Sequence, residues 1–202
     1  MSTIRKFVCP IPVSEKGEWK IDKFEVTEEA VKFQKMRSCN PSSMGRGVFE
    51  AGIYTKLMRN NEMVMSDTPD EIDDLRLIIS VATGSVLING LGLGILPMII
   101  SEKENVKEIT IIEIDRDVID LVGKYVEDRC KKYDTEITII HADAFTWKPP
   151  KGKRYNAVWH DIWNYICEDN LSEMTKLHRK YGKRCDWQYS WMRDELVYKC
   201  GR

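Results

Sequence analysis

The chain has 202 residues, a length that allows one well-buried core, with or without a small appended subdomain, and argues against two large domains. Its 31 Lys and Arg residues almost balance 32 Asp and Glu residues, so the charge gives no indication of nucleic-acid or membrane binding. Because no apolar run is long enough for a signal peptide or a membrane span, a cytoplasmic protein is expected. The six cysteines form no CxxC pair and have no histidine at ligand spacing, which predicts reduced thiols and no metal site.

The first 65 residues are predicted to form a small β-rich lead-in. Residues 18–26 and 30–36 show partial alternation of apolar and polar side chains and are expected to pair as a hairpin, while 40–47 has the residues of a loop. Residues 66–82 look like a capped helix, with Ser66 or Asp67 as N-cap and Pro69 in its first turn. We therefore expect a lead-in domain at 1–65 and a core at 66–202.

Strands and helices are predicted to alternate in this core. The expected strands are 85–89, 108–114, 136–142 and 155–161, and the expected helices between them are 95–103 and 115–133. Such alternation predicts an α/β fold of Rossmann-like type, with a parallel sheet covered by helices on its faces. The segments 170–182 and 187–199 both have helical character, so the sheet is predicted to be truncated after its fourth strand.

Glycines and acids follow the predicted strands at the edge where open parallel sheets bind ligands. Gly90, Gly92 and Gly94 form GxGxG after the first strand, Glu113 ends the second, and Asp143 follows the third. His160 and Asp161 end the fourth strand. An acid after the second strand can accept hydrogen bonds from a ribose, so the pattern predicts an adenosine-containing ligand. The phosphate-loop motif GK[ST] is absent, and Ile95 stands where the dinucleotide fingerprint GxGxxG requires glycine.

The GxGxG motif, followed by acids after the second and third strands, resembles the pattern of the class I S-adenosylmethionine-dependent methyltransferases. The blocks VLINGLGLG, EITIIEIDRDVIDLVGKYV, ITIIHADAF and YNAVWHD, within residues 86–161, are similar in order to those of spermidine synthases, the aminopropyltransferase branch of that fold. Methyltransferases usually carry an acid two residues before the first glycine. This chain has Ile88 at that position, which resembles the aminopropyltransferases instead. However, Leu93 stands where aminopropyltransferases have an acid, and DIWNYIC replaces their DSxDPxGP.

The resemblance implies S-adenosylmethionine, or its decarboxylated form, as cofactor. It places the glycine turn under the methionine and ribose, Glu113 on the ribose hydroxyls and Asp143 with Ala144 at the adenine. Asp161 matches the catalytic aspartate that helps to deprotonate the attacking amine. The expected cofactor-binding set is Asn89, Gly90, Leu91, Gly92, Gly94, Glu113, Ile114, Asp143, Ala144 and Asp161.

The expected function is an S-adenosylmethionine-dependent transferase, foremost a methyltransferase acting on an unidentified small-molecule acceptor. The alternatives are a spermidine synthase-like aminopropyltransferase and a non-catalytic cofactor-binding or interaction protein. Other features have two interpretations each: Trp159, Trp163 and Tyr165 could face a sulfonium or pack in the core. Asp67, Asp70 and Glu71 could form a polyamine-binding rim or a solvated helix start. The aromatic residues of 185–195 could form a lid or a homodimer interface.

Overall fold

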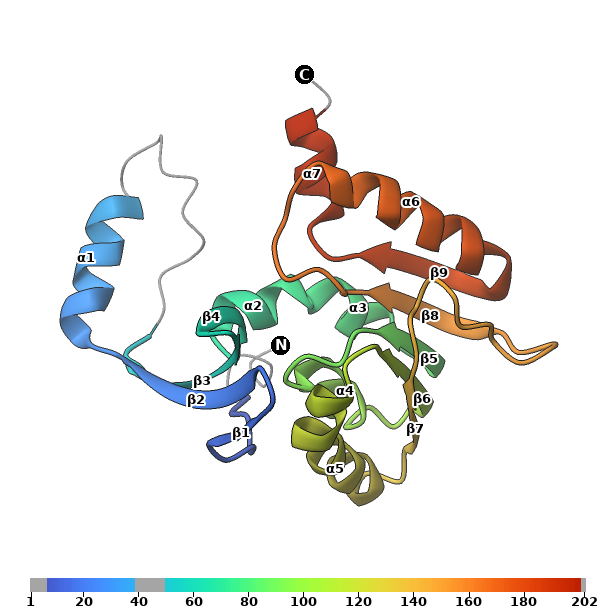
Figure 1. Cartoon of the computed structure of the whole chain (residues 1–202), viewed down its shortest axis with the longest axis horizontal. Helices are drawn as coiled ribbons and strands as arrows, with labels where there is room; N and C mark the ends of the chain where they lie inside the picture. Colours follow the sequence, from blue (N-terminus) through green and yellow to red (C-terminus); the bar gives the residue numbers. More distant parts are fainter. Residues whose placement is uncertain (1–6, 39–49, 201–202) are drawn as a thin grey trace.

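A computed structural model describes residues 7–38 and 50–200, so the predicted loop at 40–47 lies outside the described residues. Two sheets make up the fold, a four-stranded one of order β1-β2-β3-β4 and a five-stranded one of order β7-β6-β5-β8-β9 (Figure 1). No helix in these two ranges is both long and apolar enough to cross a membrane.

The lead-in is an antiparallel sheet, as predicted, but its pairing differs from the expected hairpin. Its strands are β1 (Ser14–Lys16), β2 (Trp19–Val26), β3 (Gly52–Arg59) and β4 (Glu62–Ser66), and β2 pairs with β1 and β3. The predicted second strand at 30–36 is wrong because this segment belongs to helix α1 (Glu28–Ser38). The hydroxyl of Thr27 accepts a hydrogen bond from the Ala30 amide, and glutamates follow in the first turn, so local capping decides in favour of helix.

The segment before the core contains two short helices, α2 (Pro69–Asp74) and α3 (Arg76–Val81). The predicted N-cap is wrong: Thr68 takes that position, Ser66 ends β4, and Pro69 is the first helical residue. Asp67 is buried because its carboxylate accepts hydrogen bonds from the backbone amides of Thr55 (2.5 Å) and Cys9 (2.9 Å). Asp67 thus fastens the lead-in strands and does not contribute to an acidic rim.

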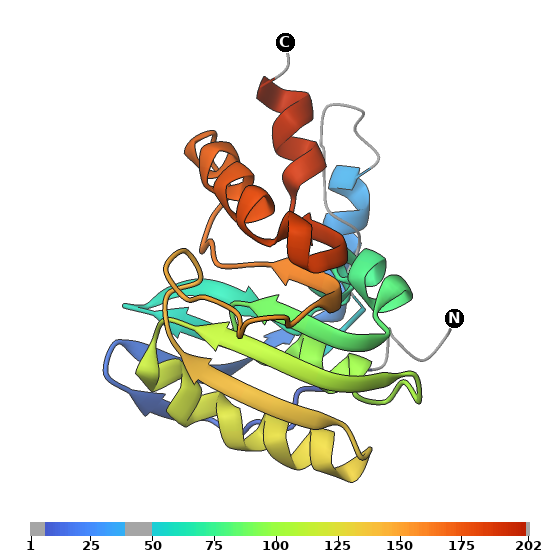
Figure 2. The same ribbon diagram turned by 90° about the vertical axis from the view of Figure 1, so that its right-hand side faces the viewer.

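The α/β core confirms the Rossmann-like prediction. Its parallel strands β5 (Gly84–Asn89), β6 (Val106–Glu113), β7 (Glu136–His141) and β8 (Tyr155–His160) correspond to the four expected ones, and α4 (Ile95–Ile100) and α5 (Arg116–Lys132) to the expected helices. Figures 1 and 2 show α4 and α5 on one face of the sheet and α6 (Asp169–Tyr181) on the other. Since both faces are covered, β5 and β6 are buried almost throughout.

The prediction that the sheet stops after four strands is wrong. A fifth strand, β9 (Cys185–Ser190), pairs in parallel with β8. Of the helix predicted at 187–199, only the later part is helical, as α7 (Arg193–Cys200). The alternating residues Trp187 and Tyr189 stack with each other and Tyr189 stacks with Trp159, each at 6.1 Å between ring centroids. Pairing and stacking against β8 therefore outweigh the helical spacing of the aromatic residues in this segment.

Specific polar contacts join the lead-in to the core. The indole N–H of Trp19 donates to Asp115 Oδ2 (2.7 Å), and Lys16 forms an ion pair with Asp120 on α5. One cluster of buried side chains includes Ile21 and Leu57 from the lead-in and residues of the core helices. These contacts hold β3 and β4 over the carboxyl ends of the core strands.

Candidate functional site

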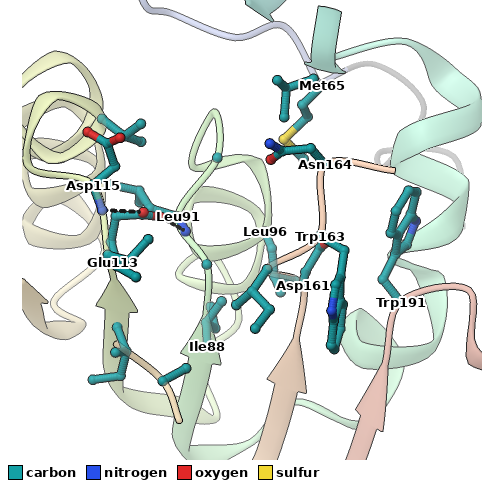
Figure 3. A pocket seen from close by; sticks show the side chains of 18 of the residues that line it. Met65, Ile88, Leu91, Leu96, Glu113, Asp115, Asp161, Trp163, Asn164 and Trp191 are labelled. Carbon is teal, nitrogen blue, oxygen red and sulfur yellow. Dashed lines mark hydrogen bonds between the residues drawn. The ribbon is translucent and has the colours of Figure 1, made fainter. Parts of the chain in front are cut away.

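A cavity of about 390 Å³ lies where the core strands end beneath the lead-in sheet. Its walls come from the turn after β5, from the ends of β6, β7 and β8, from β3 and β4, and from the segment that follows β9 (Figure 3). This is the edge at which parallel sheets present backbone amides to ligands. The volume is in the range of small-molecule binding sites.

The glycine turn is glycine for steric reasons that the structure makes explicit. Gly90 has a φ of 99°, and a β-carbon there would lie 1.9 Å from the Asp161 carbonyl oxygen. Gly92 has a φ of 51°, and its β-carbon would lie 2.6 Å from Met65 Sδ in the cavity. Gly90 therefore permits two strand ends to approach each other, and Gly92 leaves room for the Met65 sulfur above the turn.

Glu113 is buried at the end of β6 with both carboxylate oxygens held. Oε2 accepts a hydrogen bond from the Leu91 amide and Oε1 one from the Asp115 amide, both at 2.8 Å (Figure 3). Burial raises the pKa of Glu113, and the two amides oppose that shift by stabilising the carboxylate. Glu113 is therefore oriented into the cavity as a hydrogen-bond acceptor that also braces the glycine turn.

The next strand end brings Asp143 and Ala144 to the same wall. Asp143 Oδ1 accepts from the Phe145 amide (2.7 Å), and the Ala144 carbonyl accepts from Tyr181 (3.0 Å) and Lys180 (2.8 Å) of α6. Ile114 also lines the cavity although the residue is 67% exposed. An apolar side chain that is exposed at the mouth of a cavity is suited to pack against a flat ring.

Asp161 lies on the other side of the glycine turn from Glu113, among acids and indoles (Figure 3). Burial raises its pKa to about 7, and the carboxylates of Glu71 and Asp74 add to that shift. Trp163 donates its indole N–H to Glu173 (2.6 Å), and Trp191 donates to Asp74 (3.1 Å). An aromatic and acidic wall of this kind attracts cations.

His160 points away from the cavity, although it is next to Asp161. Its ring is fully buried between Asn89, whose amide lies 2.7 Å from Nδ1, and Gln188, 3.3 Å from Nε2. Burial lowers the pKa of His160 to about 3, so the imidazole is neutral. Since side chains alternate along β8, Trp159 and Asp161 face the cavity and His160 faces α6.

The structure brings most of the expected binding set together, and two of its residues lie elsewhere. The members that line the cavity are Gly90, Leu91, Gly92, Glu113, Ile114, Asp143, Ala144 and Asp161. Asn89 instead contacts His160, and Gly94, the N-cap of α4, packs against Val126. Trp159 and Trp163 line the cavity, whereas Tyr165 is 71% exposed outside it.

Sequence reasoning missed the residues that the lead-in contributes. They are Trp19, Leu57, Arg59, Val64 and Met65. Arg59 lies over the Trp19 ring at 5.3 Å and pairs with Glu18. No local motif marks these residues, since only the docking of the lead-in brings them to the core. The alternating pattern of β3 could have indicated that Leu57 is buried.

Together, the fold and the cavity define a Rossmann-like α/β protein whose cavity lies over a glycine turn, between a buried glutamate and an aspartate with a raised pKa. Residues 71–181 match the spermine/spermidine synthase domain, over more than half of the chain. The chain therefore belongs to the spermine/spermidine synthase domain family.

Methyltransferases are among the solved structures to which the chain is similar. The plantazolicin methyltransferase BpumL in complex with S-adenosylhomocysteine has 16% identity and a TM-score of 0.40 over 55% of this chain and 38% of its own. The CcbJ methyltransferase from Streptomyces caelestis has 13% identity and a TM-score of 0.44 over 56% and 44%. The glycopeptide N-methyltransferase MtfA has 16% identity and a TM-score of 0.41 over 56% and 47%. The chain thus spans less than half the length of each, and no curated protein sequence matches it.

Proposed function

We propose that this protein is an S-adenosylmethionine-dependent transferase that methylates a small-molecule amine. The observation that carries the proposal is that one cavity holds Glu113 at one end of the glycine turn and Asp161 at the other. An adenosyl sulfonium has chemistry to match both ends, a ribose diol and a reactive cation. Membership of the spermine/spermidine synthase domain family supports this class of cofactor.

Each part of the proposed cofactor has a partner in the cavity. The fixed carboxylate of Glu113 would accept hydrogen bonds from the ribose hydroxyls, and Ile114 would cover one face of the adenine. Asp143, beside Ala144, would accept from the adenine amino group. The sulfonium would then lie towards the acidic and aromatic wall, which favours a positive charge.

Transfer requires an in-line nucleophile and a path for one proton. The amine nitrogen attacks the sulfonium methyl carbon as the carbon–sulfur bond breaks, and the sulfur keeps the electron pair. Asp161 would orient the amine and take its proton, a task that suits a carboxyl group with a pKa near 7. Glu71 and Asp74, whose charges reach Asp161, would favour a cationic acceptor.

Aminopropyl transfer is a second candidate, and the acidic wall favours it specifically. A decarboxylated cofactor lacks the carboxylate that Asp161 and Glu71 would repel. Against it stands Leu93, a fully buried apolar residue at the position where the aminopropyltransferase pattern has an acid. Methyl transfer therefore remains the first proposal.

Calorimetric titration distinguishes these candidates. The protein is titrated with S-adenosylmethionine, its decarboxylated form and S-adenosylhomocysteine in the same buffer, and then incubated with a panel of amines. Binding of the carboxylate forms and release of S-adenosylhomocysteine would support methyl transfer, whereas preference for the decarboxylated form with release of methylthioadenosine would support aminopropyl transfer. Binding without either product would favour a non-catalytic role, and no heat with any ligand would overturn the proposal.

A further inference from the structure

Met65 reaches the cavity because β4 contains a bulge. In the pairing of β3 with β4, Leu57 is opposite Met65 and Met58 is opposite Met63, so Val64 has no partner of its own. Consecutive side chains of a regular strand point to opposite faces, yet Val64 and Met65 both line the cavity. Met63, which precedes the bulge, is 57% exposed. The bulge therefore turns Met65 towards the core.

The thioether of Met65 sits directly on the glycine turn (Figure 3). Its sulfur accepts a hydrogen bond from the Leu93 amide at 3.4 Å. A β-carbon on Gly92 would come within 2.6 Å of the same sulfur. Met65 therefore occupies the space that Gly92, by having no side chain, leaves open above the turn.

The other amide contacts of this turn are stronger. The Gly90 amide donates to the Ile112 carbonyl, the Leu91 amide to Glu113 and the Gly94 amide to the Leu91 carbonyl, each at 2.8 Å. A thioether sulfur is a weak acceptor compared with a carbonyl or carboxylate oxygen. Among the amides of this turn that already donate a hydrogen bond within the protein, the Leu93 amide is thus the one that a ligand can most easily take over. Methionine also has three rotatable bonds, so its sulfur can move without any movement of β4.

We propose that Met65 is a gate over the part of the cofactor site that receives the amino-acid tail. In the closed position its sulfur covers Gly92, and the tail of S-adenosylmethionine displaces it and takes over the Leu93 amide through the tail carboxylate. This inference rests on the proposed function, because it concerns how the same cofactor enters. Met65 then lowers the affinity only for adenosyl compounds that carry the tail, since a compound without a tail binds with the gate closed.

Substitutions at Met65 test the gate with two ligands that differ in their tails. S-adenosylhomocysteine carries the amino-acid tail, and methylthioadenosine has the same adenosine and sulfur without it. Because no gate has to be displaced in Met65→Ala, S-adenosylhomocysteine should bind on the order of tenfold more tightly than to the wild type. Methylthioadenosine should change by less than about twofold. Met65→Leu keeps the bulk without the sulfur and should show no gain, and Met63→Ala is the matched control.

The outcomes separate the gate from the proposed function. Equal gains for both ligands in Met65→Ala would mean a larger cavity only, and weaker binding of S-adenosylhomocysteine would make Met65 a simple contact; either result overturns the gate. Absence of binding by both ligands to every variant, wild type included, would overturn the proposed function and the gate with it. If Met65→Ala does not fold, the wild type labelled with methyl-¹³C methionine answers the question. The Met65 methyl resonance should then shift with S-adenosylhomocysteine and not with methylthioadenosine, and an equal shift would refute the gate.

Discussion

Replacement of Glu113 by glutamine tests the ribose end of the cavity most directly. The change keeps the shape of the side chain but replaces one acceptor oxygen by an NH₂ donor. The carboxylate now accepts from the amides of Leu91 and Asp115, so in Glu113→Gln one of these amides faces a donor. Loss of one charge-assisted hydrogen bond, and weakening of the other, should lower the free energy of unfolding by about 1.5–3 kcal/mol.

The effect on binding follows from the same geometry. A ribose diol can donate two hydrogen bonds to the carboxylate, and each bond to a charged group contributes about 1.5 kcal/mol or more. Glu113→Gln should therefore weaken S-adenosylhomocysteine binding by roughly 10- to 100-fold. Glu136→Gln, the same change at an exposed residue of β7, is the control and should leave both affinity and stability unchanged.

Calorimetry well below the melting temperature measures affinity on folded protein, and thermal unfolding of the same samples measures stability. The two readings separate a ligand contact from a brace of the glycine turn. If Glu113→Gln lowers the melting temperature but binds S-adenosylhomocysteine as the wild type does, Glu113 is a brace only, and the ribose assignment is refuted.

Four further predictions concern the strand ends. Gly90→Ala would place a β-carbon 1.9 Å from the Asp161 carbonyl, so it should destabilise the fold by roughly 2–4 kcal/mol in denaturant titration; a wild-type midpoint would show that the two strand ends separate at no cost. The kcat/KM of the wild type should fall as the pH drops below about 7. Asp161→Asn should lower transfer at neutral pH by roughly 100-fold or more, and its residual activity should lack this fall; an unchanged rate would remove Asp161 from the chemistry. The pKa of Asp161 is raised above the usual 3.8, so the folded state binds a proton at this carboxyl group more tightly than the unfolded state does. The free energy of unfolding of the wild type should therefore decrease as the pH rises from about 4 to 7, and Asp161→Asn should flatten this slope. His160→Ala should lower the free energy of unfolding by about 3 kcal/mol, because it leaves Asn89 and Gln188 without their imidazole partner. Because His160 faces α6, the affinity of the folded variant for S-adenosylhomocysteine should stay within about twofold of the wild type, and a large loss of affinity would contradict this placement.

Local periodicity and chain order determined much of this protein. Strands β5, β6 and β8 were predictable because a strand buried on both faces has a continuous apolar run, and helix α5 because its apolar residues recur at helical spacing. Glu113, Asp143 and Asp161 meet at one cavity because parallel strands place their carboxyl ends at one edge. The sequence therefore predicted the core and the main polar groups of the site.

Only the tertiary structure decided the features that depend on long-range contacts. Strand β9 exists because Trp187 and Tyr189 stack beside β8, and the same residues have helical spacing when considered alone. Met65 reaches the glycine turn through a bulge that no local pattern marks, and Asp67 is buried because two distant amides converge on it. The local sequence determines the backbone preference of a segment. The cavity that a side chain of this segment faces depends on other segments that pack against it from elsewhere in the chain.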